Sequence, residues 1–441
     1  MRAAAGLLPL AGLCTATLAA SVPVPVPVPV RCPATVRFTP GLVLRDGSAE
    51  QAGLGPDLPA RLAADAAGFL RPTPAHPAHP AYPGAVVLVA RHAVVAARIA
   101  VGDAVRYGPV AGGFAELPPA RRVPMRTGTR FDIASLTKLF TTVVALREVE
   151  RGTVALDAPV ARYLPEFAAG GKGAVTVREL LTHTAGLAVD LDLTRYPDRA
   201  AALDAVLRAP PAPGTRPGAQ YQYSDLDMIS LGAVAERVTG RRLDDLVGTE
   251  ITGPLGLAGT GYAPAVSTRD SAAATEYRPG YGLLRGVAHD EKVAPLGGVA
   301  GHAGLFSTAD DLAVFAQLLL DGGSYGGHRI LAPATVRAML ANANARFPGQ
   351  AHGFGVDLDQ PWYMGALASP VTFGHTGFTG TSLVADPGTG TILVLLTNEV
   401  QPDRSWTTLT GYRNVPRRTL ADDVAAALPA GTCRAWRPVP A

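Results

Sequence analysis

Lysine is scarce in this sequence of 441 residues. Of its 39 lysine and arginine side chains, only Lys138, Lys172 and Lys292 are lysines, and all the others are arginines. Arginine stays protonated in a protein, whereas a buried lysine can lose its proton and act as a base. Each of the three lysines is therefore a candidate for base chemistry that arginine cannot perform.

Strong or clustered charge is also lacking. Charged residues make up 17% of the chain, and the formal net charge of +3 is spread along its length, which argues against the basic footprint of a nucleic-acid-binding protein. Hydrophobic residues make up 48%, which is enough to build a sizeable core. No internal repeat is present, so we expect one large composite domain.

A long apolar run occurs once, at the N-terminus. Met1 and Arg2 form a short positive start, residues 3–20 are apolar, and the run ends in small residues, which is typical of a secretory signal peptide over residues 1–21. A retained membrane anchor is the alternative, although the run is short for a full span. Leu13 precedes Cys14 where a lipoprotein signal would have a small residue. We expect no membrane insertion after removal of the signal.

Cysteine is nearly absent from the rest of the chain. Residues 22–50 begin with alternating valine and proline and predict a stiff spacer and N-terminal extension, followed by a domain over residues 51–441. Loss of the signal leaves Cys32 and Cys433 near the two ends. Because export permits disulfides, we expect these two cysteines to pair, with two unpaired thiols as the alternative.

The order of expected elements predicts an α+β fold. The segments with helical periodicity are residues 57–70, 139–151, 177–181, 228–238, 312–320 and 417–428. The segments with strand character are residues 85–90, 94–101, 381–385 and 391–397, which form two hairpins. This order suits an antiparallel sheet flanked by terminal helices, with an all-helical lobe inserted between the early and late strands.

The strongest chemical signal is an S-x-x-K pattern within residues 131–139. Ser135 and Lys138 are three residues apart at the start of an expected helix and therefore share one face. A serine hydroxyl is a poor nucleophile until a base takes its proton. Burial among apolar neighbours lowers the pKa of a lysine, which would let Lys138 serve as that base. The alternative is a helix cap followed by an exposed lysine.

Two later motifs complete a set. Tyr223-Ser224-Asp225 lies far along the chain from Lys138, and the segment FGHTGFTG occupies residues 373–380, directly before the second expected hairpin. In this order the three motifs resemble those of the serine β-lactamase and penicillin-binding-protein superfamily. The second motif resembles the class C β-lactamase branch with its esterase and D-alanyl-D-alanine carboxypeptidase relatives. Residues 177–187 and 297–308 are also similar to that branch, and the resemblance extends over residues 57–428.

This resemblance implies a set of catalytic roles. Ser135 would be the acylated nucleophile, Lys138 its proton acceptor, and Tyr223 a general acid and base for the leaving group and the deacylating water. The backbone N–H groups of Ser135 and Phe378 would form the oxyanion hole. The fold implied is β-lactamase-like, of the DD-peptidase type, with no metal and no cofactor.

The resemblance also implies a substrate-binding set, and this set contains two departures. The set comprises Asp225, His375, Thr376 and Gly377, where Gly377 would let the strand edge approach the substrate. Relatives often have asparagine in place of Asp225. An ionised Asp225 can only accept hydrogen bonds, whereas an asparagine amide can also donate them. If Asp225 lies close to Lys138, its charge would raise the pKa of Lys138. His375 stands where penicillin-recognising members have lysine, and an unperturbed imidazole is mostly neutral at pH 7.

Other patterns carry weaker signals. His183 and His302 lie in the family-like stretches, and we expect both to be structural. Residues 289–292 predict a solvated loop, with a position facing the cleft as the alternative. The glycine-rich residues 297–304 lack the lysine of a phosphate loop, and no G-x-S-x-G elbow of an α/β-hydrolase is present.

The sequence therefore predicts a secreted or cell-wall-associated serine hydrolase. Its expected substrate is a small carboxylic ester or a D-alanyl peptide of the cell wall, opened through a covalent acyl-enzyme, and we expect a monomer without a nucleic-acid partner. The alternatives are a weak class C-type β-lactamase and a non-catalytic penicillin-binding or wall-sensing module that acylates once and stalls.

Overall fold

The computed structural model describes residues 36–74, 76–408 and 411–432. The predicted signal peptide, residues 22–35 of the predicted spacer and extension, and both cysteines of the predicted Cys32–Cys433 pair lie outside the described residues. Within the described ranges, no helix has the length and apolar character needed to cross a bilayer.

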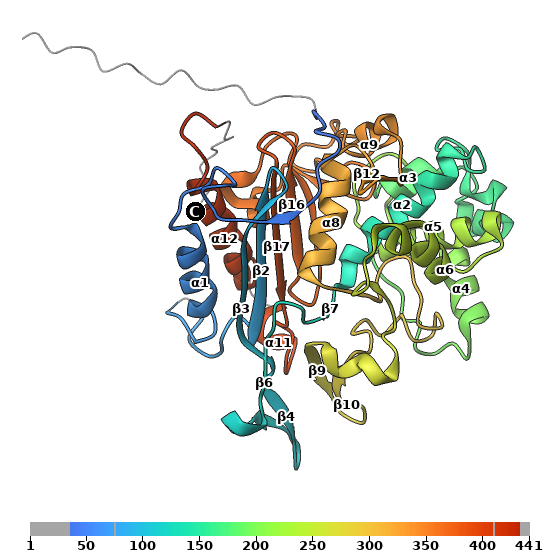
Figure 1. The fold of residues 1–441 in the computed structure, drawn as a ribbon. Helices are drawn as coiled ribbons and strands as arrows, with labels where there is room; N and C mark the ends of the chain where they lie inside the picture. Colours follow the sequence, from blue (N-terminus) through green and yellow to red (C-terminus); the bar gives the residue numbers. More distant parts are fainter. Residues whose placement is uncertain (1–35, 75, 409–410, 433–441) are drawn as a thin grey trace, which may run out of the picture.

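The centre of the molecule is an eight-stranded sheet (Figure 1). Its order is β1-β3-β2-β17-β16-β15-β14, with β6 paired to β3. Neighbouring strands are antiparallel except for the parallel pair β1 and β3. The strand bounds are β1 Arg45–Asp46, β2 Gly84–Arg91, β3 Val94–Val105, β6 Val123–Pro124, β14 Asp357–Leu358, β15 Phe373–Thr376, β16 Ser382–Asp386 and β17 Thr391–Thr397.

Both faces of the central strands are buried. Along β2, Val86 and Leu88 belong to one apolar cluster and Val87 and Val89 to the other, because successive side chains of a strand point to opposite faces. Helices α1 (Leu58–Gly68) and α12 (Asn414–Ala426) contact each other on one face, and α8 (Ala309–Leu320) covers the other (Figure 1).

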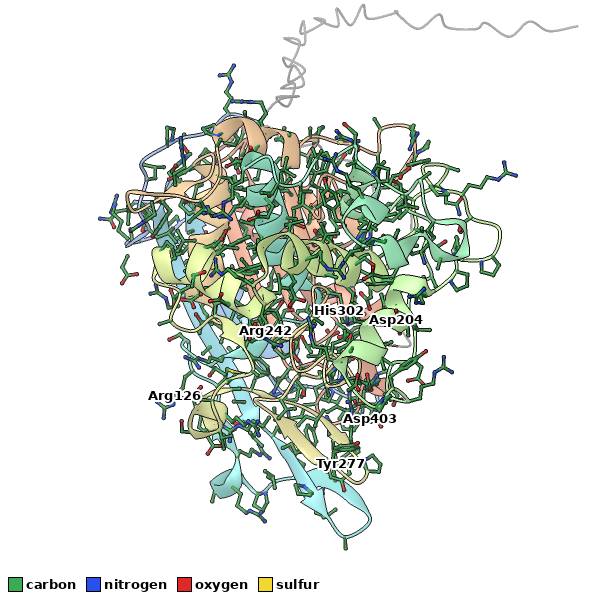
Figure 2. All side chains as sticks on the ribbon, turned by 90° about the vertical axis from the view of Figure 1, so that its right-hand side faces the viewer. Arg126, Asp204, Arg242, Tyr277, His302 and Asp403 are labelled. Carbon is green, nitrogen blue, oxygen red and sulfur yellow. The ribbon has the colours of Figure 1, made fainter. Side chains whose placement is uncertain are left out.

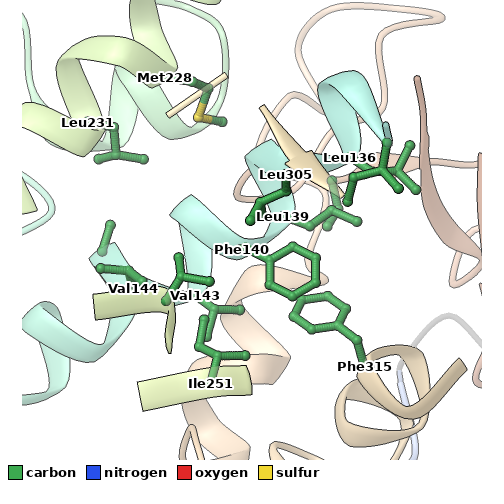
Figure 3. Packing of buried hydrophobic residues seen from close by; sticks show 14 of the residues in the cluster. Leu136, Leu139, Phe140, Val143, Val144, Met228, Leu231, Ile251, Leu305 and Phe315 are labelled. Atoms are coloured by element: carbon green, nitrogen blue, oxygen red, sulfur yellow. The ribbon is translucent and has the colours of Figure 1, made fainter. Parts of the chain in front are cut away.

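A helical lobe lies beyond α8 (Figure 1). Its elements are α2 Thr137–Glu150, α3 Val177–Leu181, α4 Arg199–Arg208, α5 Asp225–Thr239, α6 Leu243–Val247, α7 Gly253–Leu255 and α9 Pro333–Met339. Helix α2 runs through the centre of this lobe and is buried over most of its length. Phe140 of α2 stacks on Phe315 of α8 with ring centroids 4.3 Å apart (Figure 3), so the lobe and the sheet share one core.

Short strands complete the fold. Strands β7 (Phe131–Asp132), β11 (Leu305–Ser307) and β8 (Gly261–Tyr262) form a small sheet beside the start of α2. Among the described residues, further hairpins and short α-helices are β4 Tyr107–Val110 with β5 Gly113–Glu116, β9 Ala274–Arg278 with β10 Gly282–Arg285, β12 Ser324–Tyr325 with β13 His328–Arg329, α10 Pro361–Met364 and α11 Ser405–Thr408.

The predicted α+β fold is confirmed. Both expected hairpins are present, and they join through antiparallel pairing of β2 with β17. The expected helices are found with ends shifted by a few residues, and α5 ends at Thr239, capped by Gly240 with φ +68°. Two details differ from the prediction. Ser135 lies in a 3-10 turn (Ala134–Leu136) that precedes α2, and residues on the N-terminal side of residue 51 join the sheet through β1.

Candidate active site

The turn that carries Ser135 has an unusual backbone. Ala134, the preceding residue, has φ +46°, a conformation that non-glycine residues adopt rarely and at a cost. The side chain of Asp132 holds this turn, since its Oδ1 accepts the Ala134 N–H at 2.8 Å and its Oδ2 accepts the His289 N–H at 2.6 Å. Ser135 is thereby fixed at the N-terminal end of α2, where the first backbone N–H groups have no partner within the helix.

Lys138 is fully buried beside Ser135. Its Nζ donates to Ser135 Oγ at 2.9 Å and to the His302 carbonyl oxygen at 3.3 Å. It also forms an ion pair with Asp225 Oδ1 at 2.8 Å. Figure 2 shows His302 within the side-chain-filled body of the molecule. The predicted pair of Ser135 and Lys138 is thus brought together, and Asp225 joins it from the start of α5.

The electrostatics of Lys138 differ from the simple expectation of burial among apolar groups. Burial alone would lower the pKa of Lys138, but the charge of Asp225 and the interaction with Tyr223 outweigh it and raise that pKa above the ordinary value. Burial likewise opposes ionisation of Asp225, yet Lys138, His302 and Lys292 together hold the pKa of this carboxyl below its usual range. The expectation of a lowered pKa from burial is therefore wrong, whereas the expectation that a close Asp225 raises the pKa of Lys138 is confirmed.

Tyr223 reaches the same point from the segment before α5. Its ring centroid lies 4.7 Å from Lys138 Nζ, and its hydroxyl interacts with the side chains of both Ser135 and Lys138. Burial raises the pKa of Tyr223, which keeps the phenol protonated at neutral pH, while the charge of Lys138 opposes that shift. The next residue, Ser224, caps α5 by accepting the N–H groups of Leu226 and Asp227, and this cap fixes the backbone directly after Tyr223.

The buried ring of His183 packs against the ring of Tyr223. The two rings lie 4.7 Å apart, and the His183 carbonyl oxygen accepts the Gln222 N–H at 2.7 Å. His183 Nδ1 lies 2.9 Å from Asp227 Oδ2, and burial holds the pKa of His183 well below its usual value. This buried imidazole packs against the tyrosine that the sequence motif singled out.

Strand β15 forms another wall of the site, although His375 does not face the cleft. The His375 side chain is buried, its Nδ1 lies 2.7 Å from the Thr376 carbonyl oxygen, and burial lowers its pKa to about 4. Asp225 also lies away from the cleft lining, with each of its oxygens near a lysine. Of the predicted substrate-binding set, only Thr376 and Gly377 line the cleft.

Gly377 is required by a close approach of two backbone segments. A Cβ at this position would lie 2.1 Å from Thr381 Oγ1 and 2.5 Å from the Ile133 carbonyl oxygen. Both distances are shorter than van der Waals contact, so a side chain would clash here. The Oγ1 atoms of Thr379 and Thr381 donate to the carbonyl oxygens of Asp132 and Ile133 at 2.6 and 3.2 Å. The turn after β15 is thus bonded to the turn that carries the nucleophile.

Two arginines fix the peptide groups of this turn. Arg417 donates to the Gly377 carbonyl oxygen at 3.0 Å, and Arg413 donates to the Phe378 carbonyl oxygen at 2.6 Å. The C=O and N–H groups of a trans peptide point in opposite directions. Since the Gly377 carbonyl faces Arg417, the Phe378 N–H points away from Arg417.

The cleft next to Ser135 has a volume of about 350 Å³. Two aromatic side chains on its wall, Trp362 and Phe378, are 42% and 38% exposed, so the cleft offers apolar surface beside the nucleophile. Its lining residues are Ser135, Tyr223, Trp362, Thr376, Gly377, Phe378, Arg413, Asn414 and Arg417. The arrangement of a serine, a lysine, a tyrosine and an adjacent open cleft suits acyl transfer to Ser135.

Residues 289–292 are only partly solvated, so the prediction of a solvated loop holds for Glu291 alone: His289 is buried, Asp290 and Lys292 are largely covered, and Glu291 is exposed. Asp225, Asp290 and His302 are the one group of three potential metal ligands in the described part of the chain. Lys292 Nζ lies 3.1 Å from Asp290 Oδ2 and 3.3 Å from Asp225 Oδ2. This ammonium already supplies the positive charge that the carboxylates need, so the residues present do not fit a metal ion.

The comparison with protein families decides the classification. A family model described as Beta-lactamase matches residues 73–414, which include all three motifs. The chain belongs to the Beta-lactamase family. The similar curated proteins include a "Putative D-alanyl-D-alanine carboxypeptidase" of Escherichia coli K12, 35% identical over 312 residues, or 63% of this chain and 70% of that protein. A protein of the same name from Salmonella agona is 35% identical over 310 residues, or 62% and 70% of the two chains.

Solved structures with the same fold include both hydrolases and penicillin-binding proteins. This Beta-lactamase family member is similar to EstCE1, a hydrolase with promiscuous acyltransferase activity (TM-score 0.64, 25% identity, 86% of this chain and 99% of that chain). It is also similar to a penicillin-binding protein homologue from Caulobacter crescentus (TM-score 0.64, 26% identity, 85% and 99%). The protein is therefore a serine hydrolase of the β-lactamase and penicillin-binding-protein superfamily.

Two contributors to this site were missed by reasoning from the sequence. Trp362 and Arg413 lie in segments without a motif, and only the folded chain brings them to the cleft. Lys292 was marked by the scarcity of lysine, but its pairing with Asp225 had no signal in the sequence.

Proposed function

We propose that this protein hydrolyses a carboxylic ester or a D-alanyl peptide through a covalent acyl-enzyme on Ser135. The supporting observation is the hydrogen bond of 2.9 Å between Lys138 Nζ and Ser135 Oγ at the wall of an open cleft. The names of the curated relatives and of EstCE1 favour these two substrate classes.

The reaction begins when Ser135 Oγ attacks the substrate carbonyl carbon. The serine proton passes to the neutral amine form of Lys138, since an ammonium has no free electron pair to accept it. Charge that develops on the carbonyl oxygen is stabilised by the N–H groups of Ser135 and Phe378. Tyr223 passes a proton to the leaving alcohol or amine and then helps to activate the water that releases the acyl group.

The cleft favours substrates with an apolar part. Trp362 and Phe378 expose aromatic surface next to Ser135, while a neutral His375 offers no positive charge of the kind that a K-T-G lysine supplies. Thr376 and Gly377 are positioned to contact the substrate along the edge of β15. We assign Asp225 to the control of Lys138 and not to substrate contact.

A pair of probes tests the proposal. The full chain is incubated with a chromogenic short-chain ester and with a fluorescent penicillin, alongside Ser135→Ala and the exposed-serine control Ser267→Ala. Steady ester turnover that is lost in Ser135→Ala and kept in Ser267→Ala supports the hydrolase. A stoichiometric burst without turnover favours a module that acylates once, and steady consumption of penicillin alone favours a β-lactamase.

We propose in addition that the chain is exported, on the strength of the apolar segment that follows Arg2. Expression of the full chain followed by mass analysis of the extracellular protein tests this. A mature N-terminus near residue 22 is expected, and an intact Met1 on cell-retained protein would contradict export.

A further inference from the structure

Lys292 is packed against three carboxylates. Its Nζ lies 3.1 Å from Asp190 Oδ1, 3.3 Å from Asp225 Oδ2 and 3.1 Å from Asp290 Oδ2. Only 12% of its side chain is exposed, and it is not among the residues that line the cleft. An ammonium so enclosed is held by its partners and not by solvent.

The two oxygens of Asp225 are divided between two lysines. Oδ1 pairs with Lys138 at 2.8 Å and Oδ2 with Lys292 at 3.3 Å. A second path joins the same groups, because Asp290 Oδ2 also lies 3.3 Å from His302 Nε2, and the His302 carbonyl oxygen accepts from Lys138. Lys292 is therefore linked to Lys138 most directly through Asp225, and by a longer path through Asp290 and His302.

The charges of this arrangement determine how tightly Lys138 holds its proton. A carboxylate shared between two cations stabilises each of them less than a carboxylate that faces one, and the second ammonium also repels the first. Without Lys292, the charge of Asp225 would act on Lys138 alone. Asp190 acts in the opposite sense, since its carboxylate offsets part of the charge of Lys292.

The geometry points to Lys292 as a positioning residue that acts through Asp225 and sets the pH at which Lys138 can accept the proton of Ser135. This inference rests on the proposed function of Ser135 and Lys138. It assigns no contact with substrate to Lys292.

Other titratable groups face this cluster from several elements. Tyr223 interacts with Lys138 directly, while His183 and His375 couple to its charge. Asp227 couples to both Asp225 and Lys138. None of these groups changes in the variants below, so a difference between variants reports on the Lys292 pairings.

The test follows kcat/KM for a chromogenic short-chain ester against pH at low ionic strength. The acidic limb is the low-pH part of this profile, where kcat/KM rises as Lys138 loses its proton. In the full chain carrying Lys292→Met, this limb is expected to move to higher pH by about one unit, so that kcat/KM near pH 7 falls about tenfold. Lys292→Arg keeps the charge and is expected to keep the limb of the parent protein. Asp190→Asn removes a carboxylate that is 59% exposed and is expected to move the limb down by a smaller amount and raise kcat/KM at pH 7.

The opposite signs separate this role from a structural one. Damage to the fold could lower activity in Lys292→Met, but it would not raise activity in Asp190→Asn. If Lys292→Met does not fold, Asp190→Asn decides alone, and an unchanged or lower kcat/KM at pH 7 overturns the inference. An unmoved limb in a folded Lys292→Met also overturns it. Ester turnover that survives in Ser135→Ala would instead refute the proposed function.

Discussion

Lys138 Nζ and Asp225 Oδ1 lie 2.8 Å apart in the interior of the protein. The pair joins the first helical residues after the nucleophile to the first residue of α5 and ties two motifs into one unit. It also stabilises the ammonium form of Lys138, which is the form that cannot accept a proton. Activity should therefore rise with pH as Lys138 becomes neutral.

Replacement of Asp225 by asparagine should make Lys138 a better base at neutral pH. The amide keeps the shape of the side chain but removes the charge that raises the pKa of Lys138. The acidic limb of the kcat/KM profile should therefore move to lower pH by about one unit or more, which is the usual effect of one close carboxylate on a pKa. The measurement is the pH profile of ester turnover for Asp225→Asn. The matched control is Asp204→Asn, which changes an exposed aspartate of α4. Equal pH profiles for Asp225→Asn and Asp204→Asn would contradict the role of Asp225.

Replacement of Lys138 by arginine should abolish turnover. The guanidinium preserves the positive charge beside Asp225 but stays protonated at every working pH, and loss of a general base costs about 10² to 10⁴ in rate. Ester turnover is measured together with thermal unfolding, so that a folded but inactive variant can be recognised. A folded Lys138→Arg that retains turnover within tenfold of the parent would remove Lys138 from the role of base.

A methyl group at Gly377 should disturb the site and the fold together. It would meet Thr381 Oγ1 and the Ile133 carbonyl oxygen, and relief of such overpacking costs about 1–3 kcal/mol. Gly377→Ala is compared with Gly68→Ala, where a Cβ meets nothing within 4 Å. We expect lower unfolding free energy and lower kcat for Gly377→Ala alone. Parent-like values for that variant would mean that the two turns can separate without consequence.

Lys172 should make stability depend on pH in the alkaline range. It is fully buried, with Nζ donating to the Leu207 carbonyl oxygen at 2.9 Å and to that of Ala209. Burial lowers its pKa from 10.5 to about 8. The folded state therefore disfavours the ammonium, and this penalty, about 3 kcal/mol, is present in full below pH 8 and disappears as pH rises from 8 to 10.5.

The Lys172→Met variant isolates this effect. Urea unfolding of parent and variant at pH 7.5 and pH 10 gives two differences in unfolding free energy. The parent should gain stability relative to Lys172→Met on going from pH 7.5 to pH 10. A difference that stays constant, or that changes in favour of the variant, would show that the Lys172 environment accepts the charge without penalty.

Local patterns were enough to predict the elements around the site. The short runs of strand-forming residues at 85–90 and 391–397 indicate strands, and the glycine at 240 indicates the end of the helix now seen as α5. The antiparallel pairing of β2 with β17 joins distant parts of the chain, so no local pattern specifies it. The order of the elements predicted one antiparallel sheet for the early and late strands, but not which of these strands pair.

The electrostatics of the site could not be predicted from its motifs alone. Ser135 and Lys138 share one helical turn, so their contact follows from spacing. The charge state of Lys138 depends on Asp225, and that of Asp225 depends on Lys292. These residues meet only after the helical lobe has folded, so the motifs alone left open whether burial or the charge of Asp225 sets the direction in which the pKa of Lys138 moves.

The most direct test of the account is the site of acylation. The full chain is trapped with fluorescent penicillin or an activated ester, digested, and the labelled peptide is identified by mass spectrometry, with Ser135→Ala and Ser267→Ala treated in parallel. The account predicts a single acyl group on Ser135 in the parent and in Ser267→Ala, and no label in Ser135→Ala. An acyl group on another residue, or a label that persists in Ser135→Ala, would contradict it.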